Sequence, residues 1–194
     1  MKNVAVLVSG GGTNLQALIN AQIDGIVKSG KITLVVSNNP DAYALTRAQN
    51  SGIKTYVCNK KDLGSQFEDR LIEVLEQHSI DFIVLAGFMC ILSEKFTSHF
   101  SNRIINVHPS LIPSFCGKGF YGLKVHEAAL EYGVKVTGAT VHFVNEIPDG
   151  GKIIMQKAVN ILENDTPETL QKRVMEEAEW RILPLALEKV CSEL

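Results

Sequence analysis

The sequence predicts an α/β protein with a three-layer αβα, Rossmann-like architecture, in which a doubly wound, mostly parallel sheet ends in an antiparallel hairpin. Two observations support this prediction. Short β-branched apolar runs alternate with longer amphipathic segments over about the first hundred residues, an order typical of parallel strands joined by helices. Two long strand-like runs then follow each other with only a turn between them, which is typical of an antiparallel pair.

Five strands are expected in the first part of the chain. Residues 4–8 are continuously apolar and end at glycines, as buried parallel strands do. The other four strands are expected at residues 32–37, 54–58, 80–85 and 103–107. Helical spacing predicts two of the helices between them, one at Leu15, Leu18, Ile19 and Ile23 and one at Phe67, Leu71, Val74 and Leu75. A signal at one end predicts the other two, at residues 42–50 before Gly52 and from a Ser93 cap to Phe100.

The second part of the chain has a different pattern. After a loop rich in glycine, serine and proline, residues 125–132 predict a helix. Residues 135–144 and 152–161 predict the two strands of the hairpin, with its turn at 148–151. Asp165 or Thr166 is suited to cap the last helix, whose first turn holds Pro167, and we expect Pro184 to kink that helix.

The composition fits one globular domain. The 194 residues are 45% hydrophobic and 21% charged, so we expect a single domain over residues 1–194. A net charge of −2 argues against nucleic acid as the main partner. The longest apolar stretch, residues 82–92, is too short to span a bilayer, and the four cysteines are far apart. We therefore expect a cytoplasmic protein, monomeric or homodimeric, with free thiols and no metal.

The turn at residues 9–14, Ser-Gly-Gly-Gly-Thr-Asn, joins a predicted strand to a predicted helix. Glycines let the backbone approach an anion, and a helix N-terminus offers free N–H groups, so the turn favours a phosphate. Leu15 stands where a dinucleotide-binding turn has its third glycine, and the Lys-Ser/Thr pair of a P-loop is absent. A phosphate monoester therefore fits better than NAD or ATP, and a tight turn without a ligand is the alternative.

Asn106 and His108 lie two residues apart at the end of the fifth predicted strand, and so they share a face of the sheet. Ligands of open α/β sheets bind at the carboxyl ends of strands, where an amide and an imidazole can donate to a developing oxyanion. Asp149, in the hairpin turn, would raise the pKa of His108 if the two side chains met, although their spacing in the sequence does not show this. A histidine bonded to a backbone carbonyl and an aspartate that shapes its turn are the alternatives.

Other residues are weaker candidates. His142 shares a face with Thr140 and fits a supporting or a core residue equally well. His126 lies in a predicted helix beside Glu127 and is expected at the surface. Residues 88–92 form an apolar loop that suits either the core or the wall of a pocket for a flat ring. Cys116 has no evident base beside it and is interpreted as an ordinary thiol.

Four segments then carry a resemblance over nearly the whole chain, as far as Glu179 and Pro184. They are residues 8–16 (VSGGGTNLQ), 85–89 (LAGFM), 106–113 (NVHPSLIP) and 138–144 (GATVHFV), the last followed by Asp149-Gly150-Gly151. Together they resemble the phosphoribosylglycinamide formyltransferases, the folate-dependent enzymes of purine synthesis. The third segment with its downstream aspartate is highly specific for folate formyl-transfer domains.

The resemblance implies the formyltransferase fold and transfer of a formyl group from 10-formyltetrahydrofolate, a co-substrate, to the amine of glycinamide ribonucleotide, without a metal. It implies that residues 1–100 bind the phosphate and that residues 101–194 complete the folate and catalytic site. The implied catalytic residues are Asn106, His108 and Asp149. The residues implied to bind the ribonucleotide are Gly11, Gly12, Thr13, Asn14 and Glu179, and those implied at the folate are Met89, Cys90, Ile91, Leu92 and Asn106.

Two positions depart from the family pattern: Cys90 replaces a common arginine, and Pro148 replaces an aliphatic residue. Four other functions stay open. Formyltetrahydrofolate hydrolase and methionyl-tRNA formyltransferase use the same three residues, but the second needs a basic surface for tRNA. A protein that binds a phosphate sugar without catalysis would show a ligand-induced thermal shift and no turnover. A nicotinamide oxidoreductase is disfavoured by Leu15 and by the missing acidic residue after the second strand.

Overall fold

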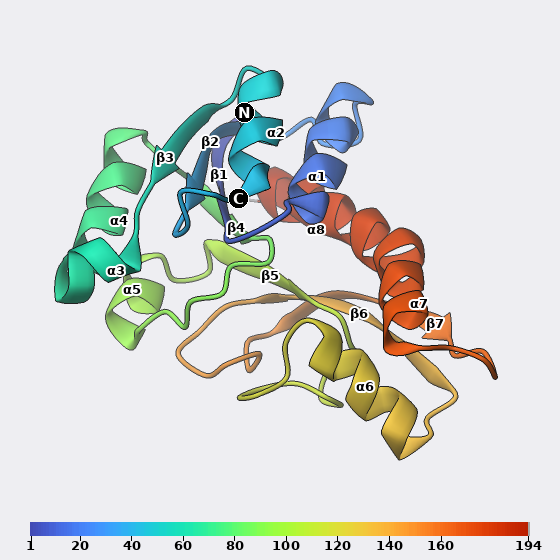
Figure 1. Cartoon of the computed structure of the whole chain (residues 1–194). Coiled ribbons are helices and arrows are strands. Elements are labelled where there is room, and N and C mark those ends of the chain that lie inside the picture. Colours follow the sequence, from blue (N-terminus) through green and yellow to red (C-terminus); the bar gives the residue numbers. More distant parts are fainter. Residues whose placement is uncertain (194) are drawn as a thin grey trace.

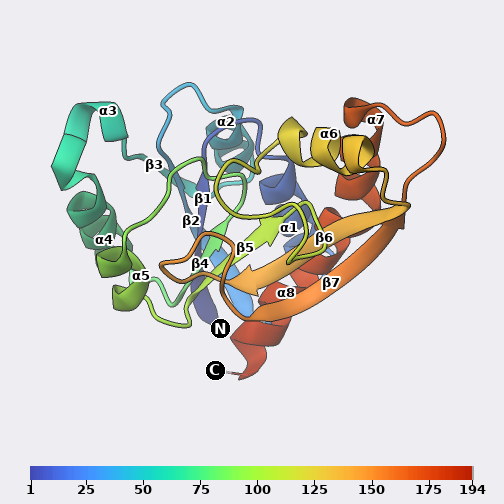
Figure 2. The ribbon, with the colours of Figure 1, turned by 90° about the horizontal axis from the view of Figure 1, so that it is seen from below.

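A seven-stranded sheet runs through the computed structural model, which describes residues 1–193 (Figure 1). The strand order is β3-β2-β1-β4-β5-β6-β7, parallel as far as β5 and antiparallel from β5 to β7. The strands are β1 (Lys2–Val8), β2 (Gly30–Ser37), β3 (Lys54–Val57), β4 (Phe82–Leu85), β5 (Ile104–His108), β6 (Val136–Phe143) and β7 (Ile153–Asn160). The predicted sheet and its hairpin are confirmed, and β7 forms one edge (Figure 2).

Helices cover both faces of the sheet. Alternate residues of β1 enter two separate cores, because Val4, Val6 and Val8 pack with α1 and α8, whereas Ala5 and Leu7 pack with α4 and α5. This alternation is the double winding that the sequence predicts. The helices are α1 (Thr13–Ile23), α2 (Tyr43–Asn50), α3 (Lys60–Leu63), α4 (Phe67–Gln77), α5 (Glu94–His99), α6 (Leu123–Tyr132), α7 (Pro167–Val174) and α8 (Trp180–Glu193).

The predicted helix starts are confirmed where a side chain caps the backbone. The Ser93 side chain accepts a hydrogen bond from the N–H of Phe96 at the start of α5. Thr166, rather than Asp165, caps α7, and Pro167 takes its first position. Asp165 instead forms an ion pair with Arg173.

Three details differ from the sequence prediction. The short α3 and the 3-10 turn after it, Gly64–Gln66, are not predicted by the sequence. Ile23, the last residue of α1, is 76% exposed and does not join the buried face of that helix. The irregularity in the last helix is a π segment, Met175–Glu179, and Pro184 lies further on, inside α8. The N–H of Trp180 bonds to the carbonyl of Met175, five residues back, and Pro184 has no N–H for the carbonyl of Trp180.

The topology places a crevice at the carboxyl ends of the central strands. Because β1 lies between β2 and β4, the chain winds outward from β1 in both directions, and ligands of open α/β sheets bind at such a switch point. Next to it, β6 pairs with β5 so that His142 lies opposite Asn106 and Thr140 lies opposite His108. None of the helices within residues 1–193 has the length and apolar composition needed to cross a membrane.

The glycine turn after β1 offers a test of the packing between α1 and α2. Gly12 has a φ of +72°, and a Cβ there would lie 2.6 Å from the Cβ of Ala44. We predict that Gly12→Ala lowers the free energy of unfolding by at least about 2 kcal/mol. Gly10→Ala is the matched control, since a Cβ at Gly10 meets no atom of the described chain within 4 Å. Urea unfolding of both variants measures the difference, and equal stabilities would contradict this packing.

Candidate active site

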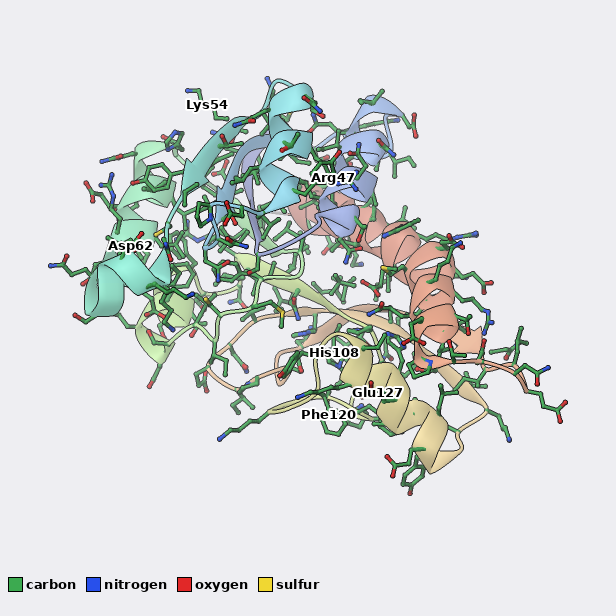
Figure 3. The ribbon with its side chains drawn as sticks, viewed as in Figure 1. Arg47, Lys54, Asp62, His108, Phe120 and Glu127 are labelled. Carbon is green, nitrogen blue, oxygen red and sulfur yellow. The ribbon has the colours of Figure 1, made fainter. Side chains whose placement is uncertain are left out.

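The three residues predicted to be catalytic come together at the end of β5. The Nδ1 of His108 lies 3.5 Å from the Oδ2 of Asp149, and the other carboxylate oxygen lies 3.5 Å from the Nε2 of His142. Asn106 completes the group, because its Nδ2 lies 3.3 Å from the same Nε2 of His142. Figure 3 locates His108 among the side chains of the lower half of the molecule. The sequence predicts Asn106 and His108 on one face, and the structure adds Asp149 from the loop after β6.

A backbone carbonyl fixes the imidazole of His108. Its Nε2 lies 2.9 Å from the carbonyl oxygen of Phe115, which can only accept, so Nε2 carries a proton. Nδ1 therefore faces Asp149. The carbonyl contact that the structural alternative requires is present at Nε2, and the functional interpretation stays a prediction, with the other ring nitrogen facing the carboxylate.

Asp149 raises the pKa of His108 as expected, but the net shift of that pKa in the free protein is downward. Burial disfavours the charged imidazole and lowers its pKa below the ordinary value, and this outweighs the opposing effects of the Asp149 carboxylate and the Phe115 carbonyl. The charge of His142 lowers it further. Without ligands, His108 is therefore mainly uncharged at neutral pH, with Nδ1 free to accept a proton.

Asp149 stays ionised in this setting. Burial raises the pKa of its carboxyl group, but the hydrogen bond with His142, the charge of His108 and the N–H of Gly117 together bring the pKa below its ordinary value. The N–H of Gly117 donates to Oδ2 over 2.8 Å. Asp149 has a φ of +56°, a conformation that aspartate tolerates better than most residues. The turn thus holds a carboxylate beside two imidazoles.

His142 is buried and lies against Asn106 and Asp149, so its position fits both of the alternatives that the sequence left open. Its Nδ1 lies 2.8 Å from the carbonyl oxygen of Phe143, so that this nitrogen donates. Its Nε2 lies 3.3 Å from the Nδ2 of Asn106 and 3.5 Å from the Oδ1 of Asp149. His142 consequently connects Asn106 with Asp149.

The glycine turn is tied to the last helices. Thr13 begins α1, and the amide of Asn14 donates to the Oε2 of Glu179 over 2.7 Å. The amide oxygen of the same side chain, Oδ1 of Asn14, is buried and has no hydrogen-bond partner within residues 1–193. A ligand donor at this position would satisfy it.

Glu179 lies in the π segment and is almost fully buried. Burial raises the pKa of its carboxyl group to about 7, against the smaller lowering effect of the Asn14 hydrogen bond. π segments inside helices often occur at functional sites. Here the wider turn carries a carboxyl group toward Asn14 at the start of α1.

Sequence reasoning missed Arg47, which lies on α2 and is labelled in Figure 3. Its Nε donates to the carbonyl oxygen of Gly11 over 2.8 Å, and its Nη1 donates to the side chain of Gln16. The guanidinium thus brings a positive charge to the turn that is predicted to hold a phosphate. A lone arginine on a helix gives no motif, so only the packing of α2 against the turn identifies it.

The segment predicted to line the folate site has exposed and buried members. Met89 and Ile91 are 58% and 70% exposed, whereas the side chain of Leu92 is buried in the core beneath α4 and α5. Leu92 therefore contributes packing, and its side chain does not line an open surface. The N–H of Met89 donates to the hydroxyl of Ser9 over 2.7 Å, and the thiol of Cys90 lies 2.9 Å from the Nδ2 of Asn38.

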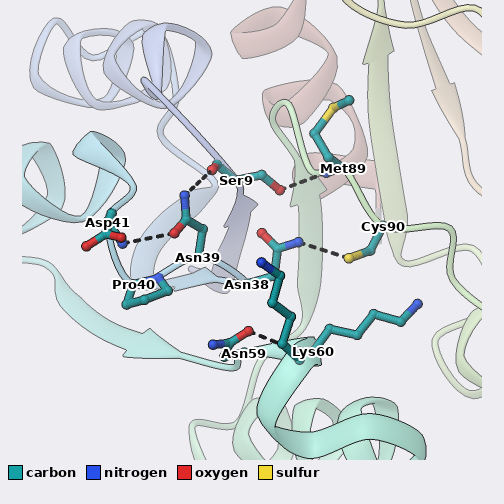
Figure 4. A pocket seen from close by; sticks show the side chains of 10 residues that line it. Ser9, Asn38, Asn39, Pro40, Asp41, Asn59, Lys60, Met89 and Cys90 are labelled. Carbon is teal, nitrogen blue, oxygen red and sulfur yellow. Dashed lines mark hydrogen bonds between the residues drawn. The ribbon is translucent and has the colours of Figure 1, made fainter.

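A cavity of about 700 Å³ opens beside this segment (Figure 4). It lies at the carboxyl ends of the strands from β1 to β4, and most of the residues that line it are polar, two lysines among them. The lining residues are Ser9, Asn38, Asn39, Pro40, Asp41, Asn59, Lys60, Lys61, Met89 and Cys90. The cavity borders the predicted folate segment and does not include the catalytic group.

Two further predictions have clear outcomes. His126 is fully buried, and so the expected surface position is wrong, because α6 turns this side chain inward together with Val125 and Ala129. Burial lowers its pKa to about 4, with a smaller contribution from the charge of His108.

Burial and the charge of Asp149 raise the pKa of the Cys116 thiol, as for an ordinary unreactive thiol.

Comparisons with known proteins agree on one family. Residues 2–187 match the family model described as formyl transferase. The chain is 42% identical over 189 residues to phosphoribosylglycinamide formyltransferase of Haemophilus influenzae, and the match covers 96% of this chain and 86% of that one. It is 46% identical to part of the human trifunctional purine biosynthetic protein adenosine-3.

The shared length differs among these relatives. The chain spans 66% of the chloroplastic phosphoribosylglycinamide formyltransferase of Arabidopsis thaliana and only 18% of the human protein. A solved structure, glycinamide ribonucleotide transformylase 1 from Symbiobacterium toebii, matches with a TM-score of 0.92 and 40% identity. That match covers 100% of this chain and 89% of the other.

The raised pKa of Glu179 gives a pH test with a defined sign. The folded protein binds a proton at Glu179 more tightly than the unfolded chain does, so protonation of Glu179 stabilises the fold. This stabilisation is complete below about pH 4.5 and is lost as pH rises through about 7. A glutamine at this position would keep the Asn14 bond without a charge. We predict that the free energy of unfolding of Glu179→Gln, taken relative to the unsubstituted protein, is about 2.5 kcal/mol higher at pH 8 than at pH 5. Urea titrations of both proteins at both pH values measure this change. If the difference in unfolding free energy between the two proteins were the same at pH 5 and pH 8, the raised pKa of Glu179 would be contradicted.

Proposed function

This chain belongs to the formyl transferase family, and we propose that it transfers the formyl group of 10-formyltetrahydrofolate to the amine of glycinamide ribonucleotide, as a step of purine synthesis. The products are formylglycinamide ribonucleotide and tetrahydrofolate. The observation that carries the proposal is the meeting of Asn106, His108 and Asp149 at the end of β5. A cytoplasmic monomer or homodimer would suffice, because all residues named in the site come from one chain.

The chemistry follows from what these groups can donate and accept. The amine of the ribonucleotide attacks the formyl carbon, a C–N bond forms, and negative charge develops on the formyl oxygen. The amide of Asn106 donates to this oxygen, and so does Nδ1 of His108 once it has taken up the proton that the amine loses. The C–N10 bond then breaks, and the proton that the amine loses is delivered to N10.

The lowered pKa of His108 fits this cycle. A buried imidazole that is uncharged at neutral pH accepts a proton from the attacking amine, whose acidity rises as its C–N bond forms. The growing charge on the formyl oxygen and the Asp149 carboxylate 3.5 Å away both stabilise the imidazolium. His108 then returns the proton to the departing N10, and the enzyme ends uncharged at this residue.

The glycine turn suits the phosphate of the ribonucleotide. Gly11, Gly12 and Thr13 offer backbone N–H groups at the start of α1, and Arg47 adds a positive charge. Asn14 and Glu179 would contact the ribose or the glycinamide end, where the unpartnered Oδ1 of Asn14 needs a donor. Met89, Ile91 and the backbone at Cys90 and Leu92 would line the folate, with no positive charge from position 90.

An absorbance assay of 10-formyltetrahydrofolate, with and without glycinamide ribonucleotide, tests the proposal. We expect turnover only when the ribonucleotide is present. Turnover without it would indicate a hydrolase, and no turnover by folded protein in either case would contradict the proposed transfer.

Variants of the two charged partners test the catalytic assignment. We predict that His108→Ala and Asp149→Ala each lower kcat by at least about 100-fold, since each loses stabilisation of the developing charge. Thermal unfolding should show both proteins folded. Lys157→Ala, an exposed change on β7, is the control and should keep full activity. Unchanged kcat in either site variant would contradict its role.

A further inference from the structure

A series of hydrogen bonds runs from the sheet edge to the loop that holds His108. It begins at Gln156, an exposed residue of the edge strand β7. The Nε2 of Gln156 lies 3.0 Å from the carbonyl oxygen of Ile112 and 3.0 Å from the hydroxyl oxygen of Thr140. One side-chain amide thus connects β7, β6 and the loop after β5.

Thr140 connects this amide to the start of the loop. Its hydroxyl is fully buried, donates to the carbonyl of Ser110 over 2.7 Å, and accepts from the N–H of Ile112 at 3.1 Å. The hydroxyl of Ser110 in turn donates to the carbonyl of Ser114 over 2.6 Å. The path of residues 110–114 is therefore set by hydrogen bonds to β6 and β7.

The same loop contacts both charged partners of the active site. Just after Ser114, the carbonyl of Phe115 accepts from the Nε2 of His108, and the N–H of Gly117 donates to Asp149. Phe115 has a φ of +49°, which a phenylalanine adopts only when its surroundings enforce it. The position of this carbonyl decides which nitrogen of His108 faces Asp149.

We propose that Gln156 is a positioning residue for His108, which acts by fixing, through Thr140 and residues 110–114, the Phe115 carbonyl that binds Nε2. With Nε2 held, Nδ1 faces Asp149 and the reacting formyl oxygen. The effect on rate rests on the proposed formyl transfer, whereas the effect on the ring of His108 does not. Because Gln156 is exposed, replacing its side chain removes the hydrogen bond to the Ile112 carbonyl without leaving a large cavity in the core.

Gln156→Glu is the sharpest variant. It keeps the shape of the side chain but replaces the donating Nε2 by an acceptor, which then faces the carbonyl oxygen of Ile112. Gln156→Ala removes the donor without adding a charge, and it carries the same test if the first variant fails to fold. Lys157→Ala, at the next residue of the same strand, is the matched control.

The first readout is the nitrogen NMR spectrum of His108 in histidine-labelled protein, about two pH units above the ordinary histidine pKa. We expect the unsubstituted protein and Lys157→Ala to show one tautomer, with the proton on Nε2. Both Gln156 variants should show a mixture, with the two ring-nitrogen shifts moved toward each other. A single, unchanged tautomer in a folded Gln156 variant would overturn the proposal.

The second readout is the kinetics of formyl transfer. We expect kcat to fall about tenfold in both Gln156 variants with KM for the ribonucleotide nearly unchanged, because only the reacting geometry is loosened. A mixed tautomer with full kcat would overturn the role in catalysis. If the unsubstituted protein shows no formyl transfer, the proposed function fails, and the NMR result alone decides the positioning of His108.

Discussion

The antiparallel pairing of β6 with β5 is the constraint on which the active site depends. It sets His142 opposite Asn106 and Thr140 opposite His108, so that each residue predicted to be catalytic on β5 has a supporting side chain on the next strand. The loop that follows β6 then folds back and brings Asp149 within 3.5 Å of both imidazoles. A fully parallel sheet would also place Asn106 and His108 at the end of a strand. The carboxylate of Asp149 reaches them because β6 runs antiparallel to β5 and its following loop starts beside the end of the sheet.

Burial determines the charges that this arrangement holds before substrates bind. It lowers the pKa of His108 and His126 and raises that of Glu179, while hydrogen bonds and neighbouring charges keep Asp149 ionised. The free site thus holds the Asp149 carboxylate beside the His108 imidazole, whose charged form burial disfavours. Such a site reorganises little as charge develops on a substrate, and the low dielectric strengthens each hydrogen bond to that charge.

Most of the fold and part of the site could be predicted from the sequence. Continuous apolar runs indicate the parallel strands, and the two-residue period places Asn106 and His108 on one face. The approach of Asp149 depends on a loop with a positive φ that folds back over the sheet, which no local pattern encodes. His126 has a charged neighbour in Glu127, and only the packing of α6 shows that it is buried. The sign of the His108 pKa shift likewise depends on desolvation, a property of the assembled protein.

The central claim is that His108 and Asp149 act as one unit on the developing charge. A double-mutant cycle of kcat/KM for formyl transfer tests it most directly, using His108→Ala, Asp149→Ala and the double variant. We predict that the double variant is no slower than the slower single variant within about threefold, because either change already disables the pair. Losses that multiply in the double variant would show two independent contributions and contradict the claim.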